Sequence, residues 1–359
     1  MDMDLKALRE EIDSLDDEIL KLLTRRAQIS CAVGQYKLQS GITTYHPARE
    51  RAILERLGAA ARPPLTPAMI EALYNVIFSI SRSLQAIKQV AYLGPEGSYS
   101  HQAALSVFSL DAELKPQGSI EDIVHEVTSG RADLGIVPVE NSTEGMVNRT
   151  LDMMATARLY VCREIMLPIR HCLLGVSSLN EVKAVYSHYQ PLAQCRNWLE
   201  TNLPGIPTVE TASTSQAAIH VSKNPGTAAI ASRAAACIYG LEILADNIND
   251  LPDNITRFWV ISRQLSGAGC ERAKTSIIVS LENTPGALFN AIGVFAAHGL
   301  NLTKIESRPS RKGPWEYMFF VDFQGSLDDA AVQAALSDLR QYTTEIIILG
   351  SYPEGSYSE

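Results

Sequence analysis

Residues 4–39 carry one uninterrupted helical pattern, and its length constrains the fold more than any other feature of the chain. Apolar side chains recur there at steps of three and four, and no proline interrupts them. At 1.5 Å per residue such a helix extends about 50 Å, which is longer than a compact unit of about 90 residues is wide. We therefore expect the stripe to be buried against a second copy of the chain. Its apolar positions are Leu5, Leu8, Ile12, Leu15, Ile19, Leu22, Ile29 and Val33.

Two shorter helices complete this first segment. Gly41 and Pro47 end the long helix, a second helix runs from near Pro47 through Leu57, and a third spans about 67–88. Residues 1–89 are therefore predicted to form an all-helical domain of three helices, intertwined as a dimer. They hold 12 Lys and Arg against 11 Asp and Glu, whereas the remainder holds 19 against 29. The overall net charge of −9 argues against a non-specific nucleic-acid binder.

The hydrophobic period changes at Val90, and the rest of the chain is mixed in type. Residues 90–266 alternate short strands with helices, and two of the helices are expected over 145–155 and 190–201. This alternation predicts two α/β lobes with a cleft between them. Residues 274–352 follow the order βαββαβ, which is the ferredoxin-like arrangement. The fold class expected for the whole chain is therefore multidomain, α plus α/β.

Cysteine spacing and hydropathy bear on the compartment. The six cysteines are scattered without a C-x-x-C pair, which is typical of reduced thiols in a cytoplasmic protein. Residues 283–303 carry no formal charge, but they contain one proline and three glycines and are only borderline in length for a membrane span. We interpret them as a buried helix with flanking turns. The acidic N-terminus does not resemble a signal peptide.

Cationic side chains of the helical segment form the first candidate site. Arg26 and Lys37 lie eleven residues apart, about three helical turns, so they share one face. Arg9 lies about 100° away from that face and would join it only from a neighbouring chain. Arginine suits planar, bidentate binding of carboxylates, although charged helix edges explain the same residues. Further candidates on the second and third helices are Arg49, Glu50, Ser81 and Gln85.

Several polar groups of the middle segment lie where a cleft is expected. The strand that ends near Val139 is followed by Glu140 and Asn141. Ser213 and Thr214 read equally well as the start of a helix. The loop at 94–100 follows a strand and opens a helix, a geometry suited to binding an anion at backbone N–H groups.

Short motifs throughout the chain resemble a known family. L-x-x-L-R-E-x-I-D-x-L-D at 5–16, V-G-x-x-K at 33–37 and P-x-R-E at 47–50 look like the helical chorismate mutases. T-R-F at 256–258 and H-C-L-L at 171–174 look like prephenate dehydratases. G-A-L at 286–288 and E-S-R-P at 306–309 resemble the ACT regulatory domain. Together they are similar to the bacterial bifunctional chorismate mutase–prephenate dehydratases of phenylalanine synthesis.

For the helical segment, this resemblance implies a site for chorismate. Arg9 would come from the second protomer, Arg26 would bind a carboxylate, and Arg49 and Ser81 would complete the site. Lys37 and Gln85 would face the ether oxygen and Glu50 the substrate hydroxyl. The rearrangement is pericyclic, so it needs orientation and electrostatic stabilisation rather than a nucleophile. His46 stands where some members carry Asp, which leaves open how the hydroxyl side is positioned and whether the mutase is active.

For the middle segment, the resemblance implies decarboxylation and dehydration of prephenate to phenylpyruvate. Thr256 would donate a hydrogen bond to the departing hydroxyl. Glu140 is the alternative acid if burial raises its pKa. The usual H-P-Q turn of the family reads His188-Tyr189-Gln190 here. Glu140, Asn141, Ser213 and Thr214 are expected to line the cleft, with Arg257 nearby as a further substrate-binding residue.

The C-terminal segment is expected to bind phenylalanine between two ACT domains as a feedback inhibitor. No metal or organic cofactor is implied, and the expected assembly is a homodimer or a larger homo-oligomer without nucleic acid or membrane partners. A rival interpretation is a binding protein, a bilobal anion binder with an ACT sensor, whose helices only dimerise. The residues implied in phenylalanine binding are Gly286, Ala287, Leu288, Glu306, Ser307 and Arg308.

Overall fold

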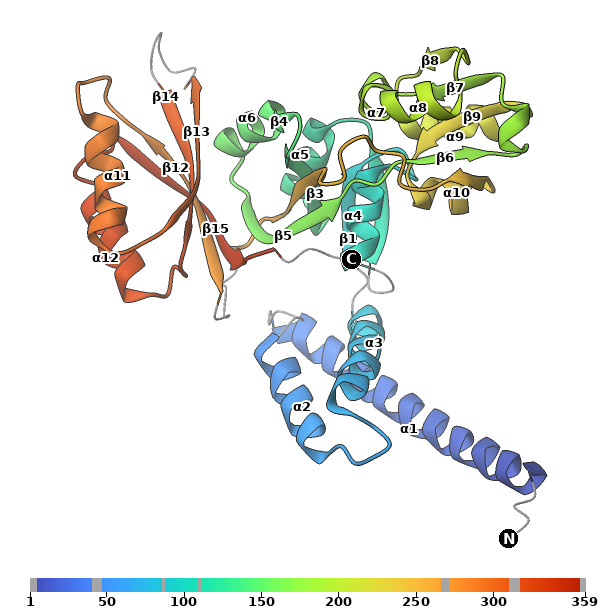
Figure 1. Ribbon diagram of the computed structural model, residues 1–359. Coiled ribbons are helices and arrows are strands. Elements are labelled where there is room, and N and C mark those ends of the chain that lie inside the picture. The colour runs from blue at the N-terminus through green and yellow to red at the C-terminus, as the bar shows by residue number, and fades with distance from the viewer. Residues whose placement is uncertain are drawn as a thin grey trace. The chain divides into compact units, whose positions relative to one another are not determined.

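The computed structural model describes residues 5–40, 47–85, 88–108, 112–265, 272–309 and 317–355 (Figure 1). The chain divides into two compact units. One contains residues 1–88 and 108–113, and the other contains residues 89–107 and 114–359.

The first unit contains the three predicted helices: α1 (Leu5–Ser40), α2 (Pro47–Ala60) and α3 (Pro67–Gln85). The second and third both begin at a proline, where the missing N–H leaves no intrahelical bond unmade. Helix α3 packs against both α1 and α2. Phe78 on α3 is only 3% exposed, and Tyr74 packs edge-on against its ring at a centroid distance of 5.9 Å.

The apolar stripe of α1 is bare within a single chain. Its exposed fractions run from 37% at Leu8 to 67% at Leu22. Helix α3 adds further exposed apolar side chains, among them Met69, Leu73 and Val76, each more than half exposed. One chain therefore leaves unburied the surface that usually stabilises a helix of this length.

The second unit begins with a lobe built on a six-stranded mixed sheet. Strand β1 runs parallel to β3, whereas β11 is antiparallel to both of its neighbours, β3 and β5. The sheet order is β2 (Ala112–Gln117), β1 (Lys88–Leu93), β3 (Leu134–Asn141), β11 (Ile255–Ser262) and β5 (Tyr160–Pro168), with β4 (Gly145–Met146) paired to β3. The helices of this first lobe are α4 (Tyr99–Val107), α5 (Ile120–Thr128) and α6 (Asn148–Thr156).

The second lobe lies between β5 and β11 in the sequence, so the chain crosses between the lobes twice. The two crossings are joined by the Ile169 N–H, which donates to the Asn254 carbonyl at 2.7 Å. The sheet order is β10 (Glu242–Ala245), β6 (Cys172–Gly175), β9 (Thr227–Ala231), β7 (Ala184–Ser187) and β8 (Thr208–Glu210). Its helices are the 3₁₀ turn η1 (Leu179–Glu181), α7 (Tyr189–Gln194), α8 (Arg196–Asn202), α9 (Thr214–Ser222) and α10 (Arg233–Tyr239).

Two elements differ from the sequence-based expectation. The helix expected over 190–201 is broken at Cys195, and the Asp250 carboxylate accepts the first amides of α8, from Asn197 at 3.0 Å and Trp198 at 3.1 Å. A carboxylate at a helix start stabilises the free N–H groups there. The helix expected from Gly145 begins at Asn148 instead, because Gly145 and Met146 pair with β3.

The C-terminal part of this unit is an antiparallel sheet in the order β13 (Leu302–Pro309), β14 (Tyr317–Gln324), β12 (Ala273–Ser280) and β15 (Glu345–Pro353). Helices α11 (Ala287–Ala297) and α12 (Ala330–Leu339) cover one of its faces (Figure 1). The predicted ferredoxin-like order is confirmed. Residues 283–303 fold as a turn, α11 and the beginning of β13, and no described helix is long and apolar enough to cross a membrane.

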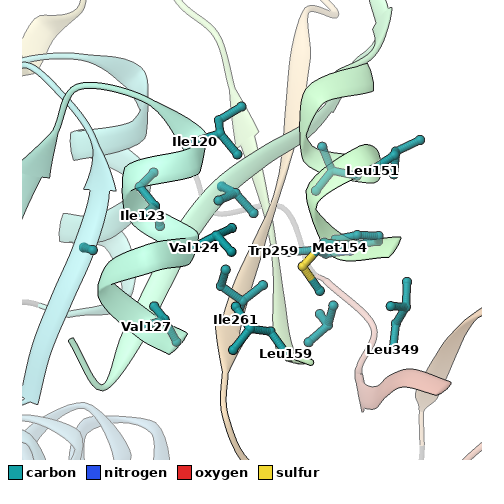
Figure 2. Packing of buried hydrophobic residues seen from close by; sticks show 14 of the residues in the cluster. Ile120, Ile123, Val124, Val127, Leu151, Met154, Leu159, Trp259, Ile261 and Leu349 are labelled. Atoms are coloured by element: carbon teal, nitrogen blue, oxygen red, sulfur yellow. The ribbon is translucent and has the colours of Figure 1, made fainter. Parts of the chain in front are cut away.

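The other face of this sheet shares its core with the first lobe. Ile278, Phe320 and Leu349 belong to the same buried cluster as Trp259 and Ile261. Figure 2 shows Leu349 beside α6 and the strand that carries Trp259. The C-terminal sheet and the first lobe are therefore held together by a common hydrophobic core.

We predict that Gly350→Ala destabilises this unit. A Cβ at Gly350 on β15 would lie 2.1 Å from the carbonyl oxygen of Val161 on β5, so one backbone must move. Overpacking of this kind costs about 1–3 kcal/mol. The control is Gly293→Ala in α11, where a Cβ meets nothing within 4 Å and helix propensity favours alanine. Thermal unfolding of the two variants checks this, and an unchanged melting temperature for Gly350→Ala would contradict it.

Candidate functional site

In the helical unit, the structure brings Arg26 and Ser81 together. The Arg26 guanidinium donates to the Ser81 hydroxyl, which itself donates to the Ile77 carbonyl at 2.7 Å. The guanidinium also lies over the Phe78 ring, 5.6 Å from its centroid. Ser81 is buried and Arg26 half-buried, so α1 and α3 hold one cation in a defined position.

The other candidates of this unit are less enclosed in a single chain. Arg9 and Arg49 are exposed, and Glu50 is half-buried. The side chains of Lys37 and Gln85, and the whole of His46, lie outside the described part of the chain. The structure therefore supports one pair of the expected set and leaves the complete arrangement a prediction.

In the first lobe, Thr256 and Asn141 are cross-strand partners on β11 and β3. The Asn141 amide nitrogen donates to the Thr256 hydroxyl at 2.8 Å and to the Asn254 side-chain oxygen at 2.7 Å. Its oxygen accepts from the backbone N–H groups of Thr143 at 3.0 Å and Glu144 at 3.2 Å. These backbone donors fix the orientation of the amide. Thr256 is therefore a hydrogen-bond acceptor from Asn141, which leaves its own hydroxyl hydrogen available to another group.

A chain of polar side chains continues from this pair into the second lobe. Asn254 donates to the Gln194 side-chain oxygen at 3.1 Å, and His171 Nε2 lies 2.8 Å from the same oxygen. His171 Nδ1 lies 2.5 Å from the Tyr99 hydroxyl. Burial lowers the pKa of His171 and the hydrogen bond with Gln194 opposes this, which agrees with a neutral ring that donates from Nε2 and accepts at Nδ1. These hydrogen-bonded side chains fix the two lobes to each other where the polypeptide crosses between them.

The loop at 94–98 does not support the expected anion site. The Gly97 N–H donates to His101 Nδ1 at 3.0 Å, and the Gly94 N–H donates to the Gln117 carbonyl at 2.9 Å. The loop instead contacts the second lobe, where the Ser232 hydroxyl donates to the Gly97 carbonyl at 2.7 Å. The N–H groups of Gly94 and Gly97 are thus used within the protein and are not offered to an anion.

Ser213 and Thr214 lie at the beginning of α9 in the second lobe. Ser213 is the N-cap, and its hydroxyl accepts from the Gln216 N–H at 3.1 Å. Thr214 is the first residue of the helix and is half-buried. In the described part of the chain no hydrogen bond joins either residue to Thr256 or Asn141.

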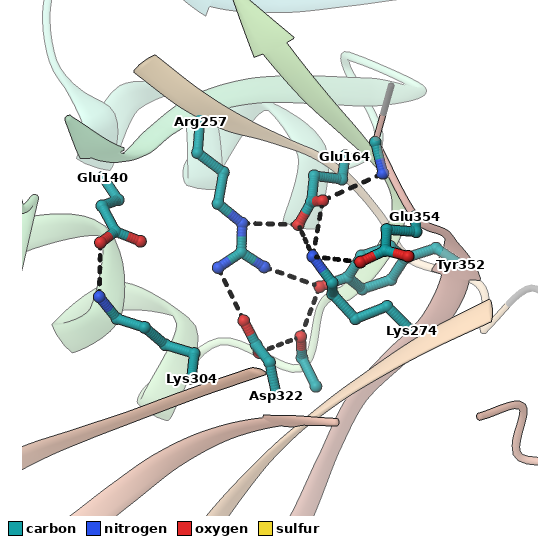
Figure 3. A network of polar contacts seen from close by, with 10 residues as sticks. Glu140, Glu164, Arg257, Lys274, Lys304, Asp322, Tyr352 and Glu354 are labelled. Atoms are coloured by element: carbon teal, nitrogen blue, oxygen red, sulfur yellow. Dashed lines mark hydrogen bonds and ion pairs between the residues drawn. The ribbon is translucent and has the colours of Figure 1, made fainter. Parts of the chain in front are cut away.

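The structure corrects the placement expected for Glu140 and Arg257. They are cross-strand partners one residue along from Asn141 and Thr256, so the alternation of a strand turns them to the opposite face of the sheet. There Glu140 pairs with Lys304 of β13, and Arg257 pairs with Asp322 of β14 at 2.7 Å. Both side chains bind the C-terminal sheet (Figure 3).

Arg257 lies in a buried network of charges. Its Nε donates to Glu164 at 2.6 Å and its Nη2 to the Tyr352 hydroxyl at 3.2 Å. Burial opposes the charge of Arg257, but Asp322, Tyr352 and Glu164 raise its pKa. Burial likewise tends to raise the pKa of Glu164, and the charges of Arg257 and Lys274 hold it below its usual value. Both groups are therefore charged at neutral pH.

The expected effector residues fall on two elements. Gly286 is the N-cap of α11 with a φ of +83°, Ala287 begins the helix, and Leu288 is 37% exposed. On β13, Ser307 is exposed, Glu306 is half-buried, and Arg308 donates to Asp152 of α6 at 2.8 Å. No hydrogen bond or ion pair in the described ranges joins the two groups.

Sequence reasoning missed the polar residues that continue the site beyond Asn141. His171 belongs to the quoted H-C-L-L motif, and Asn254 lies two residues before T-R-F, so these motifs were a usable signal. Gln194 belongs to no motif, and only the tertiary structure places it against Asn254.

Three family models match successive parts of the chain. Residues 8–86 match chorismate mutase type II, residues 90–266 match prephenate dehydratase, and residues 275–341 match the ACT domain.

Relatives that share one name, bifunctional chorismate mutase/prephenate dehydratase, match nearly the whole length of this chain. The bifunctional chorismate mutase/prephenate dehydratase of Aquifex aeolicus (strain VF5) is 44% identical over 363 residues, 99% of each chain. That of Escherichia coli (strain K12) is 36% identical over 371 residues, 97% of this chain and 96% of the relative. Among solved structures, the prephenate dehydratase from Arthrobacter aurescens in complex with L-Phe is 34% identical, with a TM-score of 0.69. The match covers 74% of this chain and 90% of that one.

Proposed function

The chain belongs to the bifunctional chorismate mutase/prephenate dehydratases, and from this we propose how its residues divide the two reactions. The enzyme rearranges chorismate to prephenate and then converts prephenate to phenylpyruvate. We assign the first step to residues 1–89, the second to 90–266 and regulation to 274–352. The proposed compartment is the cytoplasm.

Fixed cations account for the mutase step. The rearrangement needs chorismate held in its compact form, with negative charge stabilised on the ether oxygen as the bond breaks. Arg26, held by Ser81 and the Phe78 ring, binds a substrate carboxylate, and Arg49 assists. Lys37 and Gln85 donate to the ether oxygen, and Glu50 binds the hydroxyl.

A homodimer completes this site. Arg9 lies on α1 about 100° from the face of Arg26, so it reaches the substrate only from a second protomer. The exposed stripe of α1 supports such a partner, because burying apolar side chains of this size contributes about 1.5–3 kcal/mol each. The second chain thus supplies both the stability of the long helix and one arginine.

Complementation tests the shared site. Arg9→Ala and Arg26→Ala are each expected to be inactive as mutases. When the two variants are unfolded and refolded together, half of the dimers are mixed, and each mixed dimer holds one intact site. Mutase activity then returns to roughly a quarter of the wild-type value. Steady-state chorismate consumption measures this, and no recovery in a preparation that contains mixed dimers would contradict the assignment of Arg9.

The dehydratase step uses Thr256. Loss of the ring carboxylate as carbon dioxide leaves an electron pair that aromatises the ring and expels the hydroxyl group. Asn141 donates to Thr256, so the Thr256 hydrogen is directed to the leaving oxygen. A threonine hydroxyl is a weak acid, so its contribution is a hydrogen bond rather than full proton transfer. Ser213 and Thr214, at the positive end of α9, bind a carboxylate of prephenate.

The environment of Glu140 favours Thr256 as the donor. Glu140 lies on the face opposite Thr256 and pairs with Lys304. We therefore assign no proton transfer to Glu140.

Reciprocal variants test the division of labour. Arg26→Met is expected to lower mutase activity at least about 100-fold, because the cation that binds a substrate carboxylate and orients chorismate is lost, and to spare the dehydratase. Thr256→Val is expected to lower dehydratase activity about 100-fold and spare the mutase, whereas Thr256→Ser retains the hydroxyl and part of the activity. Chorismate loss and phenylpyruvate formation are followed in the same sample. Loss of both activities in either folded variant would indicate one shared site.

Phenylalanine is the proposed effector of the C-terminal sheet. The support is the ACT match and the L-Phe complex of the Arthrobacter aurescens relative. The positive end of α11, after Gly286, suits a carboxylate, and Leu288 offers apolar contact. Ala287, Glu306, Ser307 and Arg308 complete the proposed set.

Phenylalanine is therefore expected to lower phenylpyruvate formation by the wild-type enzyme. Leu288→Lys should abolish this inhibition, because it places an ammonium group at the apolar contact. Ala334→Lys, at an exposed position on α12, is the charge-matched control and should remain inhibited. Titration of prephenate turnover with phenylalanine measures the effect, and equal inhibition of both variants would exclude Leu288 from the site.

A further inference from the structure

The two residues that carry the dehydratase step each have a neighbour that reaches the other side of the sheet. Asn141 and Thr256 are cross-strand partners, and Glu140 and Arg257 are the next pair along the same two strands. A strand alternates its side chains between faces, so the two pairs point to opposite sides of the sheet. Because the pairs are adjacent along both strands, a displacement of the second pair also moves the backbone that carries the first.

The C-terminal sheet presents a matching pair to these two residues. Lys304 on β13 and Asp322 on β14 are themselves cross-strand partners. Lys304 pairs with Glu140, and Asp322 pairs with Arg257 at 2.7 Å. Figure 3 shows the two ion pairs side by side, each joining a strand of the first lobe to a strand of the C-terminal sheet. The four charges alternate in sign around this contact.

The Arg257 side of this contact is rigid. The side chain of Arg257 is 8% exposed, that of Asp322 6% and that of Glu164 1%. Removing one member of a buried ion pair leaves an uncompensated charge, so the partners hold each other in place. The nitrogens of Arg257 are occupied by Glu164, Asp322 and Tyr352, and its side chain faces away from Thr256.

We propose that Arg257 and Lys304 are positioning residues for the dehydratase, which set the geometry of Thr256 and Asn141 from the C-terminal sheet through two ion pairs. The proposal rests on the function assigned above to Thr256 and Asn141. Arg257 thus acts through the strand that carries Thr256 and does not bind a substrate carboxylate. A displacement of β13 and β14 reaches the dehydratase site by this route.

Lys304→Met tests the proposal at the half-buried pair, where the fold tolerates the change better than at Arg257. Lys304 and Glu140 are 27% and 28% exposed. A misplacement of about 1 Å costs on the order of 100-fold in rate, so a partial loosening is expected to lower kcat for prephenate about tenfold. KM should change little, because the groups that bind substrate remain. Lys304→Arg keeps the charge and should retain kcat.

The matched control is Asp152→Asn. It removes an ion pair of similar exposure, Arg308–Asp152 at 2.8 Å, between the same strand β13 and the same lobe. Its partner lies on α6 rather than beside a dehydratase residue, so kcat should stay within twofold of wild type. An equal fall in Lys304→Met and Asp152→Asn would show a general docking effect and overturn the proposal.

A double-mutant cycle separates positioning from chemistry at Glu140. If Glu140 acts only through Lys304, then Glu140→Gln, Lys304→Met and the double variant should show similar kcat values. Losses that multiply would show that Glu140 has its own role and would overturn the proposal. A kcat for Lys304→Met within twofold of the wild-type value would also overturn the proposal.

Mutase activity in the same samples reports on enzyme concentration. If the wild-type enzyme did not turn over prephenate at all, the proposed function itself would fail. If the wild type turns over prephenate and Lys304→Met has the same kcat, only the positioning role fails.

Discussion

The packing of the larger unit depends on the ion pairs and hydrogen bonds of one buried guanidinium, that of Arg257. A charge withdrawn from water is stable only with partners of opposite sign and satisfied hydrogen bonds. Its partners come from β5, β14 and β15, so one residue of β11 ties two sheets together. Lys274 of β12 extends the network through Glu164 at 2.9 Å. The dehydratase lobe and the ACT sheet consequently form a single core rather than two bodies on a linker.

The two reactions place different demands on the chain. The mutase step needs fixed charge around a dianion, and a bundle of helices supplies it with few elements. The cost is an apolar stripe that one chain leaves exposed. At the crossings between the two lobes, Asn141, Asn254 and Gln194 form a row of hydrogen bonds that ends on the Thr256 hydroxyl, the group proposed above for the dehydratase step.

Periodic segments were predictable because their burial pattern is local. The long helix and the βαββαβ order follow from side-chain spacing alone. The break in the helix at Cys195 was not predictable, because the Asp250 carboxylate that stabilises the start of α8 comes from a distant part of the chain. Glu140 and Arg257 were expected at the cleft because they stand next to Asn141 and Thr256 in their motifs. The alternation of side chains along a strand turns them to the opposite face. Adjacent residues of one strand cannot both face the cleft.

The sequence by itself determined the family, the three parts and the residue types that each reaction requires. These follow from motifs and periods that are written along the chain. Only the tertiary structure decided which residues of β3 and β11 face the ACT sheet and which face the opposite side. That choice depends on the register between β3 and β11 and on the sheet packed behind them. Pairing between strands more than a hundred residues apart leaves no local trace in the sequence.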